Sequence, residues 1–443
     1  MKMGELDGIV TGGRRRIAVV GSGIAGLASA LLLSRRERVT LYEADGRLGG
    51  HSNTVDIEVE GRRLAVDTGF LVFNRRTYPE LCALFAMLGV EAVESEMSFS
   101  VSLAEPELEW AGSDLGTLFA QPRNLLRPAF LGMLKDIMRF NAAATRAAAG
   151  TEAVPDMALG DYLDRHRYGA AFRHWYLLPM AAAIWSCPTR TMLDYPFATF
   201  ARFCHNHGLL QIFDRPQWMT VRGGAREYVR RIAAQLDDVR TATPVLGVER
   251  GADGVRLHTR GGGESYDEVV FACHSDQALR ILGEAASAEE RAILGAVRYQ
   301  DNRAVLHTDP ALLPRRPKVW SAWNYLAGRG EAAERPVSVS YLLNRLQPLG
   351  VDTPVVVSLN PFDEPAADKV LRTIDYAHPV FDSAAIAAQA RLHEIQGVRR
   401  TWFAGAWTGY GFHEDGLRSA LAVASALGAG IPWRAQEREK VAS

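Results

Sequence analysis

Apolar residues near the start of the chain follow the order of a buried strand, a helix and a second strand. Residues 16–20 form a β-branched apolar run, which is typical of a central parallel strand covered on both faces. Apolar side chains recur at helical spacing through residues 27–33, and a second apolar run, 39–42, ends at Glu43. This pattern predicts the first strand–helix–strand unit of an α/β nucleotide-binding domain.

Similar patterns recur far along the chain. Apolar runs at residues 268–273 and 402–407 predict buried strands, and residues 243–245 predict a short one. An amphipathic stretch covers residues 228–236, and apolar positions continue at helical spacing over residues 420–428. We therefore expect one nucleotide-binding domain assembled from three separated segments, residues 14–77, 217–298 and 394–432.

The two insertions between those segments have a different character. Residues 78–216 are richer in helix formers and aromatic residues. Residues 299–393 contain three strand-like runs, at 304–307, 338–343 and 354–359. Together the insertions predict a discontinuous α+β substrate domain beside a Rossmann-like α/β domain.

Composition and charge limit the classes of function. The chain has 443 residues, of which 48% are hydrophobic and 23% charged, as in a soluble globular protein of two domains. Its formal net charge of −1 gives no overall field that would attract nucleic acid. Arg14–Arg16 precede an uncharged run of 17 residues, 17–33, but the run contains spaced glycines, lacks a cleavage site and is short for a membrane span. We therefore expect neither a secretion signal nor an integral membrane protein.

The four cysteines lie far apart and form no Cys-x-x-Cys pair; they are Cys82, Cys187, Cys204 and Cys273. We therefore expect no metal site, no disulfide framework and a reducing, cytoplasmic location. The simplest interpretation of each cysteine is a small buried hydrophobic residue.

The turn after the first strand carries a glycine-rich phosphate-binding pattern. In the sequence GSGIAG, Gly21 permits a tight turn, Gly23 lets the backbone approach a pyrophosphate and Gly26 lets the helix pack closely. The helix amino terminus offers unpaired N–H groups to the phosphates. Glu43 follows Gly21 by 22 residues and is placed to accept hydrogen bonds from ribose hydroxyls. The pattern predicts a dinucleotide site that includes Gly21, Gly23, Ile24, Ala25, Gly26 and Glu43.

The residues after Glu43 favour FAD over a nicotinamide cofactor. Residues 43–51, EADGRLGGH, resemble the E-x-x-x-R-x-G-G-[R/K/H] signature of flavin amine oxidases, protoporphyrinogen oxidases and phytoene desaturases. The resemblance implies FAD in a two-dinucleotide-binding fold, an arginine that donates charge-assisted hydrogen bonds to the nucleotide, and a later segment, 67–70, beside the flavin. The contacts it adds are Ala44, Arg47, Gly49, Gly50, His51, Asp67, Thr68, Gly69 and Phe70.

Two remote segments resemble the parts with which this superfamily closes the flavin site. In the first, residues 220–248, the resemblance places the backbone of Val245 or Val248 near the adenine. The second, residues 402–417, resembles a carboxy-terminal motif whose helix presents its first N–H groups to the flavin and stabilises the reduced ring. No cysteine lies there, so FAD is expected to be non-covalent. The contacts expected there are Gly405, Asp415, Gly416 and Leu417, with Asp415 as the helix N-cap.

Aromatic strings in the insertions and the later strands narrow the resemblance. Residues 172–180, 203–210, 271–279 and 320–325 are similar to a bacterial subfamily of flavoproteins that accompany cyclopropane-fatty-acid-synthase-like methyltransferases. In that group, furan-fatty-acid pathways use a flavoprotein desaturase that acts on a methyl-branched unsaturated acyl chain. The resemblance therefore implies a fatty-acyl or phospholipid substrate and a functional link to such a methyltransferase.

Two departures from the amine oxidase pattern disfavour amine oxidation. Amine oxidases of this type place a lysine before the last substrate-domain strand, whereas residues 301–305, DNRAV, contain none. The tyrosine of their aromatic cage is matched here by Phe412. Amine oxidation, isomerisation of a polyunsaturated fatty acid, and a non-catalytic role in delivering substrate to a methyltransferase are the alternatives to desaturation.

Removal of hydride from an acyl chain leaves a proton that a base must accept. Imidazole titrates near neutral pH, and the candidates are therefore His205, His207, His274 and His413. The first two are preferred because their neighbours are apolar and aromatic, as suits an acyl tunnel. For each histidine a structural role is the alternative, and the same holds for the aromatic residues Trp185, Trp323 and Tyr325.

Access to a bilayer lipid requires a membrane contact, and residues 115–140 are the candidate surface. They are rich in large apolar residues, with basic side chains at multiples of four, namely Arg123, Arg127, Lys135 and Arg139. Pro128 is expected to open a helix that carries along one face Phe130, Leu131, Leu134 and Ile137. The pattern predicts either an interfacial helix, peripheral on the inner face of the cytoplasmic membrane, or an ordinary core-facing helix.

Overall fold

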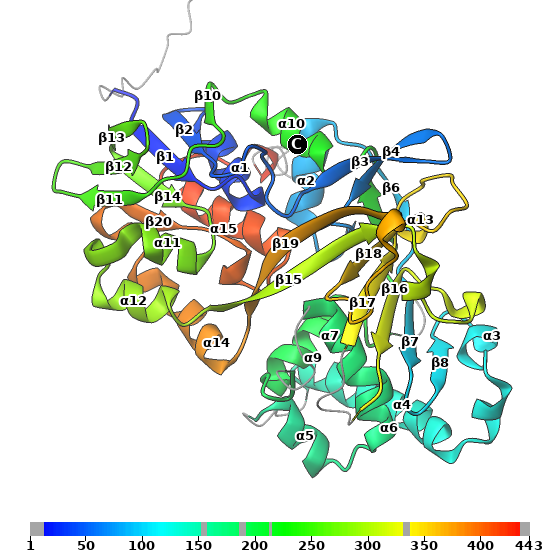
Figure 1. The fold of residues 1–443 in the computed structure, drawn as a ribbon. Coiled ribbons are helices and arrows are strands. Elements are labelled where there is room, and N and C mark those ends of the chain that lie inside the picture. Colours follow the sequence, from blue (N-terminus) through cyan, green and yellow to red (C-terminus); the bar gives the residue numbers. More distant parts are fainter. Residues whose placement is uncertain (1–12, 152–156, 186–191, 212–214, 331–336, 435–443) are drawn as a thin grey trace, which may run out of the picture.

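A computed structural model of the protein describes residues 13–151, 157–185, 192–211, 215–330 and 337–434. One part of the molecule is built on a five-stranded parallel sheet and the other on a seven-stranded mixed sheet (Figure 1). The parallel sheet has the strand order β10-β2-β1-β14-β20. Its strands are β1 (Arg16–Val20), β2 (Arg38–Tyr42), β10 (Asp238–Arg240), β14 (Glu268–Phe271) and β20 (Thr401–Phe403).

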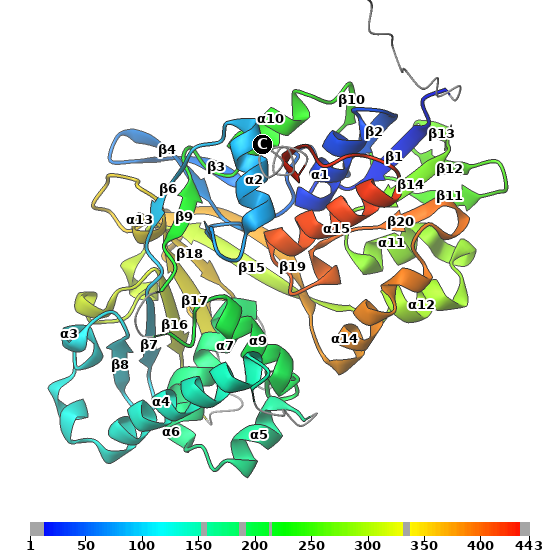
Figure 2. The ribbon, with the colours of Figure 1, turned by 180° about the vertical axis from the view of Figure 1, so that it is seen from behind.

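Helices cover the parallel sheet, and two of them, α1 (Ile24–Leu33) and α15 (His413–Ala426), lie side by side (Figure 2). Every residue of α1 is buried, which explains why the apolar run over residues 17–33 has no polar face. The other helices of this part are α2 (Pro79–Leu88), α10 (Arg226–Ala233), α11 (Ser275–Leu282), α12 (Ala288–Leu294) and α14 (Ser383–Ala390). In the part of the chain that the structure describes, no helix is both long and apolar enough to cross a membrane.

Small antiparallel sheets extend the nucleotide-binding part. The hairpin of β3 (Thr54–Val59) and β4 (Arg62–Asp67) returns the chain toward the end of the Gly-Gly turn. A second sheet packs beside the parallel one and contains β11 (Gly247–Arg250), β12 (Val255–Thr259) and β13 (Gly262–Tyr266). A third joins the two parts and contains β5 (Phe73–Asn74), β6 (Ala92–Ser95) and β9 (Trp218–Val221).

The seven-stranded sheet has the order β19-β15-β18-β17-β16-β7-β8. Its strands are β7 (Phe99–Leu103), β8 (Leu108–Ala111), β15 (Arg298–His307), β16 (Trp323–Ala327), β17 (Val337–Leu342), β18 (Val356–Leu359) and β19 (Val370–Val380). Helices gather at one end of this sheet (Figure 1), namely α3 (Leu115–Leu118), α4 (Pro128–Ala148), α5 (Leu159–Arg165), α6 (Ala170–Phe172), α7 (Leu178–Trp185) and α9 (Phe197–Asn206). A short helix, α13 (Leu343–Leu346), follows β17. Apart from α2 and α14, which pack with the parallel-sheet part, the insertions therefore supply the strands and helices of an α+β unit.

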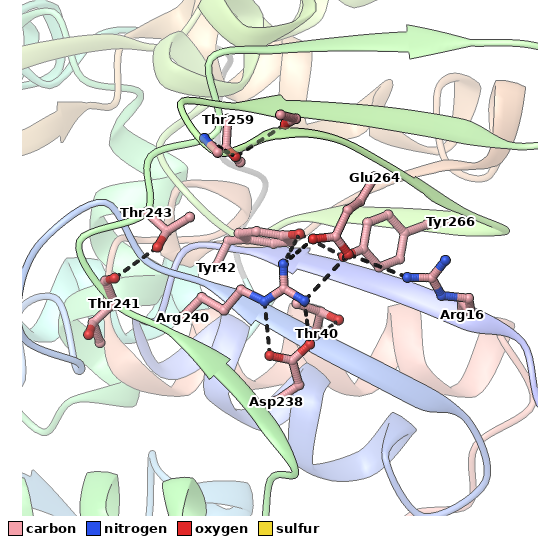
Figure 3. Close-up of polar contacts among 12 residues, drawn as sticks. Arg16, Thr40, Tyr42, Asp238, Arg240, Thr241, Thr243, Thr259, Glu264 and Tyr266 are labelled. Carbon is pink, nitrogen blue, oxygen red and sulfur yellow. Dashed lines mark hydrogen bonds and ion pairs between the residues drawn. The ribbon is translucent and has the colours of Figure 1, made fainter.

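A polar network fixes β10 at the edge of the parallel sheet (Figure 3). Arg240 donates from Nε and Nη2 to the carboxylate of Asp238 at 2.9 and 2.8 Å, and it also pairs with Glu264 on β13. The hydroxyls of Tyr42 and Tyr266 lie 2.6 Å apart in the same network. These contacts tie the edge of the parallel sheet to the neighbouring antiparallel sheet and so position the loop that follows β10.

That loop corrects one prediction, because residues 243–245 form no strand. The N–H of Thr243 donates to the carbonyl of Glu43 at 2.8 Å. The next residue, Pro244, has no N–H to give to a strand ladder. Val245 is nevertheless buried, in the same apolar cluster as Val20, and so the loop lies at the carboxyl end of β2.

The long edge strand β19 was not among the strands that the sequence pattern predicted. Polar residues such as Asp375, and Pro379, lie among the apolar residues of this strand. Most of its side chains are half-buried or exposed, so no continuous apolar run marks it. Its partner β15 was predicted only over residues 304–307, and the strand begins earlier, at Arg298.

Candidate active site

The glycine-rich turn lies at the carboxyl end of β1 and leaves room in front of helix α1. Gly21 has φ = 101°, and a Cβ there would come within 2.9 Å of the carbonyl oxygen of Ala272. A Cβ on Gly26 would lie 1.8 Å from the carbonyl oxygen of Gly21, so the helix packs directly on the turn. A Cβ on Gly23, in contrast, would meet nothing within 4 Å. The open side of the turn, at the first N–H groups of α1, is where a pyrophosphate fits.

Glu43, at the end of β2, is held by the same turn. Its Oε2 accepts hydrogen bonds from the N–H and the hydroxyl of Ser22, at 2.9 and 2.5 Å. Its Oε1 accepts one from the N–H of Asp45 at 2.9 Å. Because a carboxylate oxygen has two acceptor sites, Oε1 retains capacity for a ribose hydroxyl. Ala44 is exposed in the following turn.

The Gly-Gly turn packs against the phosphate-binding turn. Gly49 and Gly50 have φ values of 111° and 56°, in a region where side chains are unfavourable. The N–H of Gly49 donates to the carbonyl of Ser22 at 3.0 Å, and a Cβ on Gly50 would lie 3.3 Å from the Cα of Gly23. Arg47 donates from Nη1 to the carbonyl of Gly50 at 2.8 Å, which closes the turn. Contact between Arg47 and the nucleotide stays a prediction.

Residues 67–70 begin at the last residue of β4 and lie against His51, the residue after the Gly-Gly turn. The N–H of Phe70 donates to the carbonyl of His51 at 2.8 Å, and a Cβ on Gly69 would lie 2.3 Å from that carbonyl oxygen. The carboxylate of Asp67 accepts from the hydroxyl of Thr54 at 2.5 Å and from the N–H of Ala225 at 3.0 and 3.1 Å. Burial raises the pKa of Asp67 to about 7, and its donors act against that rise. Asp67 therefore holds this loop in place.

The carboxy-terminal motif meets the first nucleotide motif at α15. Gly416 lies so close to α1 that a Cβ on it would come within 2.9 Å of Ile24 Cγ2. Gly405 lies two residues after the strand β20 and has φ = 158°, and a Cβ there would lie 2.5 Å from Trp407 Nε1. Leu417 is fully buried in the core, which leaves only its backbone for a cofactor.

The position predicted for Asp415 is wrong, because Phe412 rather than Asp415 precedes the first residue of α15. Asp415 is the third helical residue, and its Oδ2 accepts from the N–H of Phe412 at 3.0 Å. A carboxylate at that position reaches back to the helix start, as in a capping box. Burial raises the pKa of Asp415 to about 6.

The structure adds two residues that sequence reasoning missed, Tyr376 and His378 on β19. The ring of Tyr376 stacks on that of His51, with centroids 4.8 Å apart, and its hydroxyl lies 2.8 Å from the hydroxyl of Thr68. The ring of His378 lies 5.1 Å from that of His51. Most side chains of residues 370–380 are half-buried or exposed, so no apolar run in the sequence marks these two residues. We call the set Thr68, His51, Tyr376 and His378 the ring-end cluster.

His274 lies at the edge of the ring-end cluster. It precedes α11, and its ring stacks on Tyr299 with centroids 4.4 Å apart. Its ring centroid is 6.3 Å from that of His51. Burial lowers the pKa values of both histidines. Nε2 of His51 is buried without a hydrogen-bond partner among the described residues, so this polar atom requires a ligand or a water.

His413 connects α15 to the Gly-Gly turn and is the weakest of the candidate bases. Its Nε2 lies 2.8 Å from the hydroxyl of Ser52 and 3.3 Å from that of Tyr228. Its ring stacks on Phe70 with centroids 3.7 Å apart. These contacts occupy Nε2 and one face of the imidazole with protein groups, and burial lowers the pKa of His413 to about 3. We assign His413 a structural role.

His205 lies in the last turn of α9, and His207 follows the last residue of that helix. The ring of His207 stacks on Phe203 with centroids 4.0 Å apart and lies 5.3 Å from Phe412. Its Nδ1 lies 3.0 Å from the carbonyl oxygen of Phe203, which only accepts. Nδ1 therefore carries the proton, and Nε2 of the neutral ring has a free lone pair. For His205 no ring contact is recorded among the residues described.

These features define an α/β flavoprotein with a Rossmann-like FAD-binding domain of the two-dinucleotide-binding type and a discontinuous α+β substrate domain. The family model of flavin-containing amine oxidoreductases matches residues 24–305, which is more than half of the chain. The chain belongs to this family, and its cofactor is FAD. The free space at Gly23 and the unpartnered Nε2 of His51, which follows the Gly-Gly turn, fit a dinucleotide that passes along this turn.

Known proteins support the same fold. The chain is 30% identical over 332 residues to a carotenoid phi-ring synthase of Streptomyces griseus, and the match covers 69% of this chain and 60% of that protein. The structure of a candidate protoporphyrinogen oxidase from Exiguobacterium sp. 255-15 matches with a TM-score of 0.65 at 18% identity, covering 94% and 99% of the two chains. A fatty acid isomerase from P. acnes that produces CLA matches with a TM-score of 0.65 at 13% identity, covering 94% and 99%.

Proposed function

We propose that this protein is an FAD-dependent desaturase that removes hydride from an unsaturated, methyl-branched fatty-acyl chain, as in furan-fatty-acid formation. The observation that carries the proposal is the aromatic wall around His207. Phe203 lies 5.2 Å from Phe412 and 5.7 Å from Tyr410, between ring centroids, and these two residues immediately precede α15. Aromatic residues of α9 therefore lie next to the helix start that faces the flavin in the family. An apolar wall suits an acyl chain.

The chemistry divides between the cofactor and one imidazole. FAD supplies the hydride acceptor when it is bound. Loss of hydride from an allylic carbon leaves a cation, and loss of a proton from the adjacent carbon completes the new double bond. A C–H next to a cationic carbon is strongly acidic, so a weak base is sufficient. His207 meets this need, because its Nε2 is free to accept while burial lowers its pKa to about 4.

Amine oxidation has less support in the site. The stretch 301–305 lies on β15, and its buried polar residue, Asn302, hydrogen-bonds Asn360 and His378. No lysine is present there. Phe412 packs on Phe203 and cannot supply the hydroxyl of a tyrosine.

Isomerisation of a fatty acid and reaction of a carotenoid-type polyene are the other candidates. The fold likeness to a fatty acid isomerase and the kinship with a carotenoid phi-ring synthase support each of them in turn. All three substrates are long apolar chains and would use the same aromatic wall. Desaturation and isomerisation differ in the redox balance of the product, and the reaction of a polyene differs in the substrate.

Mass spectrometry of the product distinguishes these reactions. We expect purified protein, given a phospholipid with a methyl-branched monoenoic chain, to form a product that lacks two hydrogen atoms, with one reduced flavin per product under anaerobic conditions. Unchanged mass with oxidised flavin at the end of turnover would indicate isomerisation. Peroxide release with polyamines, and none with lipid, would indicate amine oxidation. Activity only on a carotenoid would replace the acyl substrate.

We further propose that the protein reaches this substrate at a membrane surface. Large apolar side chains are exposed along residues 115–138, with exposed fractions of 87% at Leu126, 75% at Leu115 and 65% at Met138; the others are Leu125 and Leu131. Basic side chains alternate with them, including Lys135, which is exposed. The interfacial face differs from the predicted one, because Phe130 is fully buried and Ile137 packs on the core. A link to a fatty-acid methyltransferase stays a proposal that follows from the substrate.

A further inference from the structure

His378, one of the two residues that β19 brings to the ring-end cluster, has a side-chain partner on the neighbouring strand. β19 pairs with β15 so that Gln300 lies opposite His378 and Asn302 lies opposite Tyr376. Nδ2 of Asn302 lies 2.9 Å from Nδ1 of His378. Asn302 is almost completely buried, so this contact is shielded from water.

Backbone groups fix the direction of this hydrogen bond. The N–H of Arg303 donates to the side chain of Asn360 at 2.9 Å, so the amide atom there is the oxygen. The amide nitrogen of Asn360 therefore faces Asn302 and donates to its oxygen at 2.7 Å. The amide nitrogen of Asn302 is left to donate to the carbonyl of Gln300 at 3.0 Å and to Nδ1 of His378. A backbone donor at one end and a backbone acceptor at the other leave one orientation for both amides.

The direction of the hydrogen bond determines where the proton of His378 lies. A ring nitrogen that accepts a hydrogen bond carries no proton, so the neutral ring is protonated at Nε2. A second proton on Nδ1 would face the amide hydrogens of Asn302 and would be unfavourable. Burial acts in the same direction and lowers the pKa of His378 to about 4. His378 is therefore an uncharged group with one N–H donor in a fixed position.

The surroundings of His378 indicate what this donor meets. Its ring lies 5.1 Å from that of His51, the residue that follows the Gly-Gly turn. Phe70 binds the carbonyl of His51, and Thr68 binds the hydroxyl of Tyr376. The loop 67–70 reaches the cluster through Thr68 and Phe70, and the start of α15 reaches that loop because His413 stacks on Phe70. Because Tyr376 and His378 lie on the seven-stranded sheet, the ring-end cluster lies on the side of the dinucleotide site that faces the substrate domain.

We propose that Asn302 and Asn360 are positioning residues that hold His378 as the Nε2–H tautomer, and that this N–H donates a hydrogen bond to the isoalloxazine ring of bound FAD. The proposal rests on FAD as the cofactor and is independent of the acyl substrate. Reduction adds electron density to the ring, and a hydrogen bond to a more negative acceptor is stronger. The donor therefore stabilises reduced FAD more than oxidised FAD.

Nitrogen-15 NMR of histidine-labelled holoprotein tests the tautomer. We expect the His378 signals, assigned with His378→Gln, to show a bare Nδ1 and a protonated Nε2 at pH 7. Asn302→Asp replaces the amide donor by an acceptor and should move the proton to Nδ1 or protonate both nitrogens. His393→Gln, which changes an exposed histidine, serves as the assignment control. A wild-type His378 that is protonated on Nδ1 would overturn the proposal.

The reduction potential of the bound flavin tests the acceptor. We expect His378→Phe to weaken the preference for reduced over oxidised FAD about tenfold, which lowers the potential by about 30 mV for a two-electron couple. His378→Gln retains an N–H donor and should restore part of the shift, and Asn302→Leu should give an intermediate value. If His378→Phe does not retain FAD, the reduction potentials of His378→Gln and Asn302→Leu, each compared with wild type, test the hydrogen bond instead.

Failure of this inference and failure of the proposed desaturase function give different results. Potentials equal to wild type in every variant, with FAD bound, would overturn the hydrogen bond to the flavin whatever the substrate. A normal shift in potential without any turnover of acyl lipid would retain this inference and reject the proposed desaturase. The potential is measured without substrate, so neither result depends on the other.

Discussion

Gly416 of α15 packs against Ile24 of α1 so closely that a Cβ on the glycine would lie 2.9 Å from Ile24 Cγ2. Ile24 belongs to the first nucleotide motif, residues 21–26, and Gly416 belongs to the last, residues 402–417. Their contact sets the distance between the amino termini of α1 and α15, whose N–H groups we expect to face FAD. The glycine is therefore required by packing, since its backbone is helical and needs no special φ.

Replacement of Gly416 by alanine should weaken FAD binding although it raises helix propensity. The added methyl group forces α15 away from α1, and overpacking of this kind costs about 1–3 kcal/mol. FAD affinity, measured by fluorescence titration of apoprotein, should fall at least tenfold. Ile24→Ala should partly rescue Gly416→Ala, because it removes the opposing Cγ2.

A matched glycine in another helix controls for propensity. A Cβ on Gly132 of α4 would meet nothing within 4 Å. Gly132→Ala should therefore stabilise the protein by about 0.5–1 kcal/mol in urea unfolding and leave FAD affinity unchanged. Equal behaviour of the two alanine variants would show that the contact between Gly416 and Ile24 has no role.

His207→Gln should reduce turnover of the acyl substrate by about 100-fold or more, the usual contribution of a positioned base. The loss should appear in the rate of flavin reduction at saturating substrate, with FAD still bound. His205→Gln is the matched control at the same end of α9 and should retain activity within about twofold. A large loss of turnover in His205→Gln, with activity retained in His207→Gln, would assign the base to His205.

Serine at both Leu125 and Leu126 should abolish binding to vesicles that contain anionic lipid. These two leucines expose apolar surface that a bilayer would cover. Removal of that surface from water contributes about 25 cal/mol of binding free energy per Å². Flotation of protein with vesicles measures the effect. Leu246→Ser, at a leucine that is 57% exposed on the nucleotide-binding part, should bind like wild type. Wild-type protein that stays at the bottom of the gradient would rule out the membrane contact.

The apoprotein should lose stability as the pH falls from about 6.5 to about 4. His307 is fully buried, its Nδ1 accepts from the N–H of Asp309 at 3.0 Å, and burial lowers its pKa to about 4. Between those pH values the unfolded chain binds a proton that the folded ring does not. The free energy of unfolding therefore falls by up to about 1.4 kcal/mol per pH unit for this group.

Urea unfolding at pH 7, 6 and 5 measures that slope. His307→Leu should be less stable at pH 7 and should show a shallower dependence on pH than wild type. His393→Leu changes an exposed histidine and should leave the slope unchanged. An unchanged slope in His307→Leu would mean that the buried ring takes up its proton without unfolding.

The sequence predicted the nucleotide-binding part well because its signals are local. The strand over residues 16–20 and the glycines at 21, 23 and 26 each perform a task that their own neighbours define. The Gly-Gly turn is similar, since positive φ at Gly49 and Gly50 can be expected from residue type alone. What these residues could not reveal is that Glu43 and Arg47 also bind the protein's own turns.

The ring-end cluster could not be predicted because it depends on strand pairing across the chain. Tyr376 and His378 lie on an edge strand without an apolar run, and their partners are 76 to 327 residues away in sequence. The register of β19 on β15 decides which of its residues face His51. The exposed side of α4 was misjudged for a related reason, since only packing shows that Phe130 faces inward and Met138 outward.

Absorbance of the purified protein during titration with FAD tests the central claim, that segments near residues 21, 50 and 416 enclose one dinucleotide. We predict one FAD per chain, a rise in melting temperature with added FAD, and release of all flavin into the supernatant on acid precipitation. Gly26→Val, whose side chain would overlap the carbonyl of Gly21, should bind none. A colourless wild-type protein whose melting temperature does not respond to FAD would contradict the account.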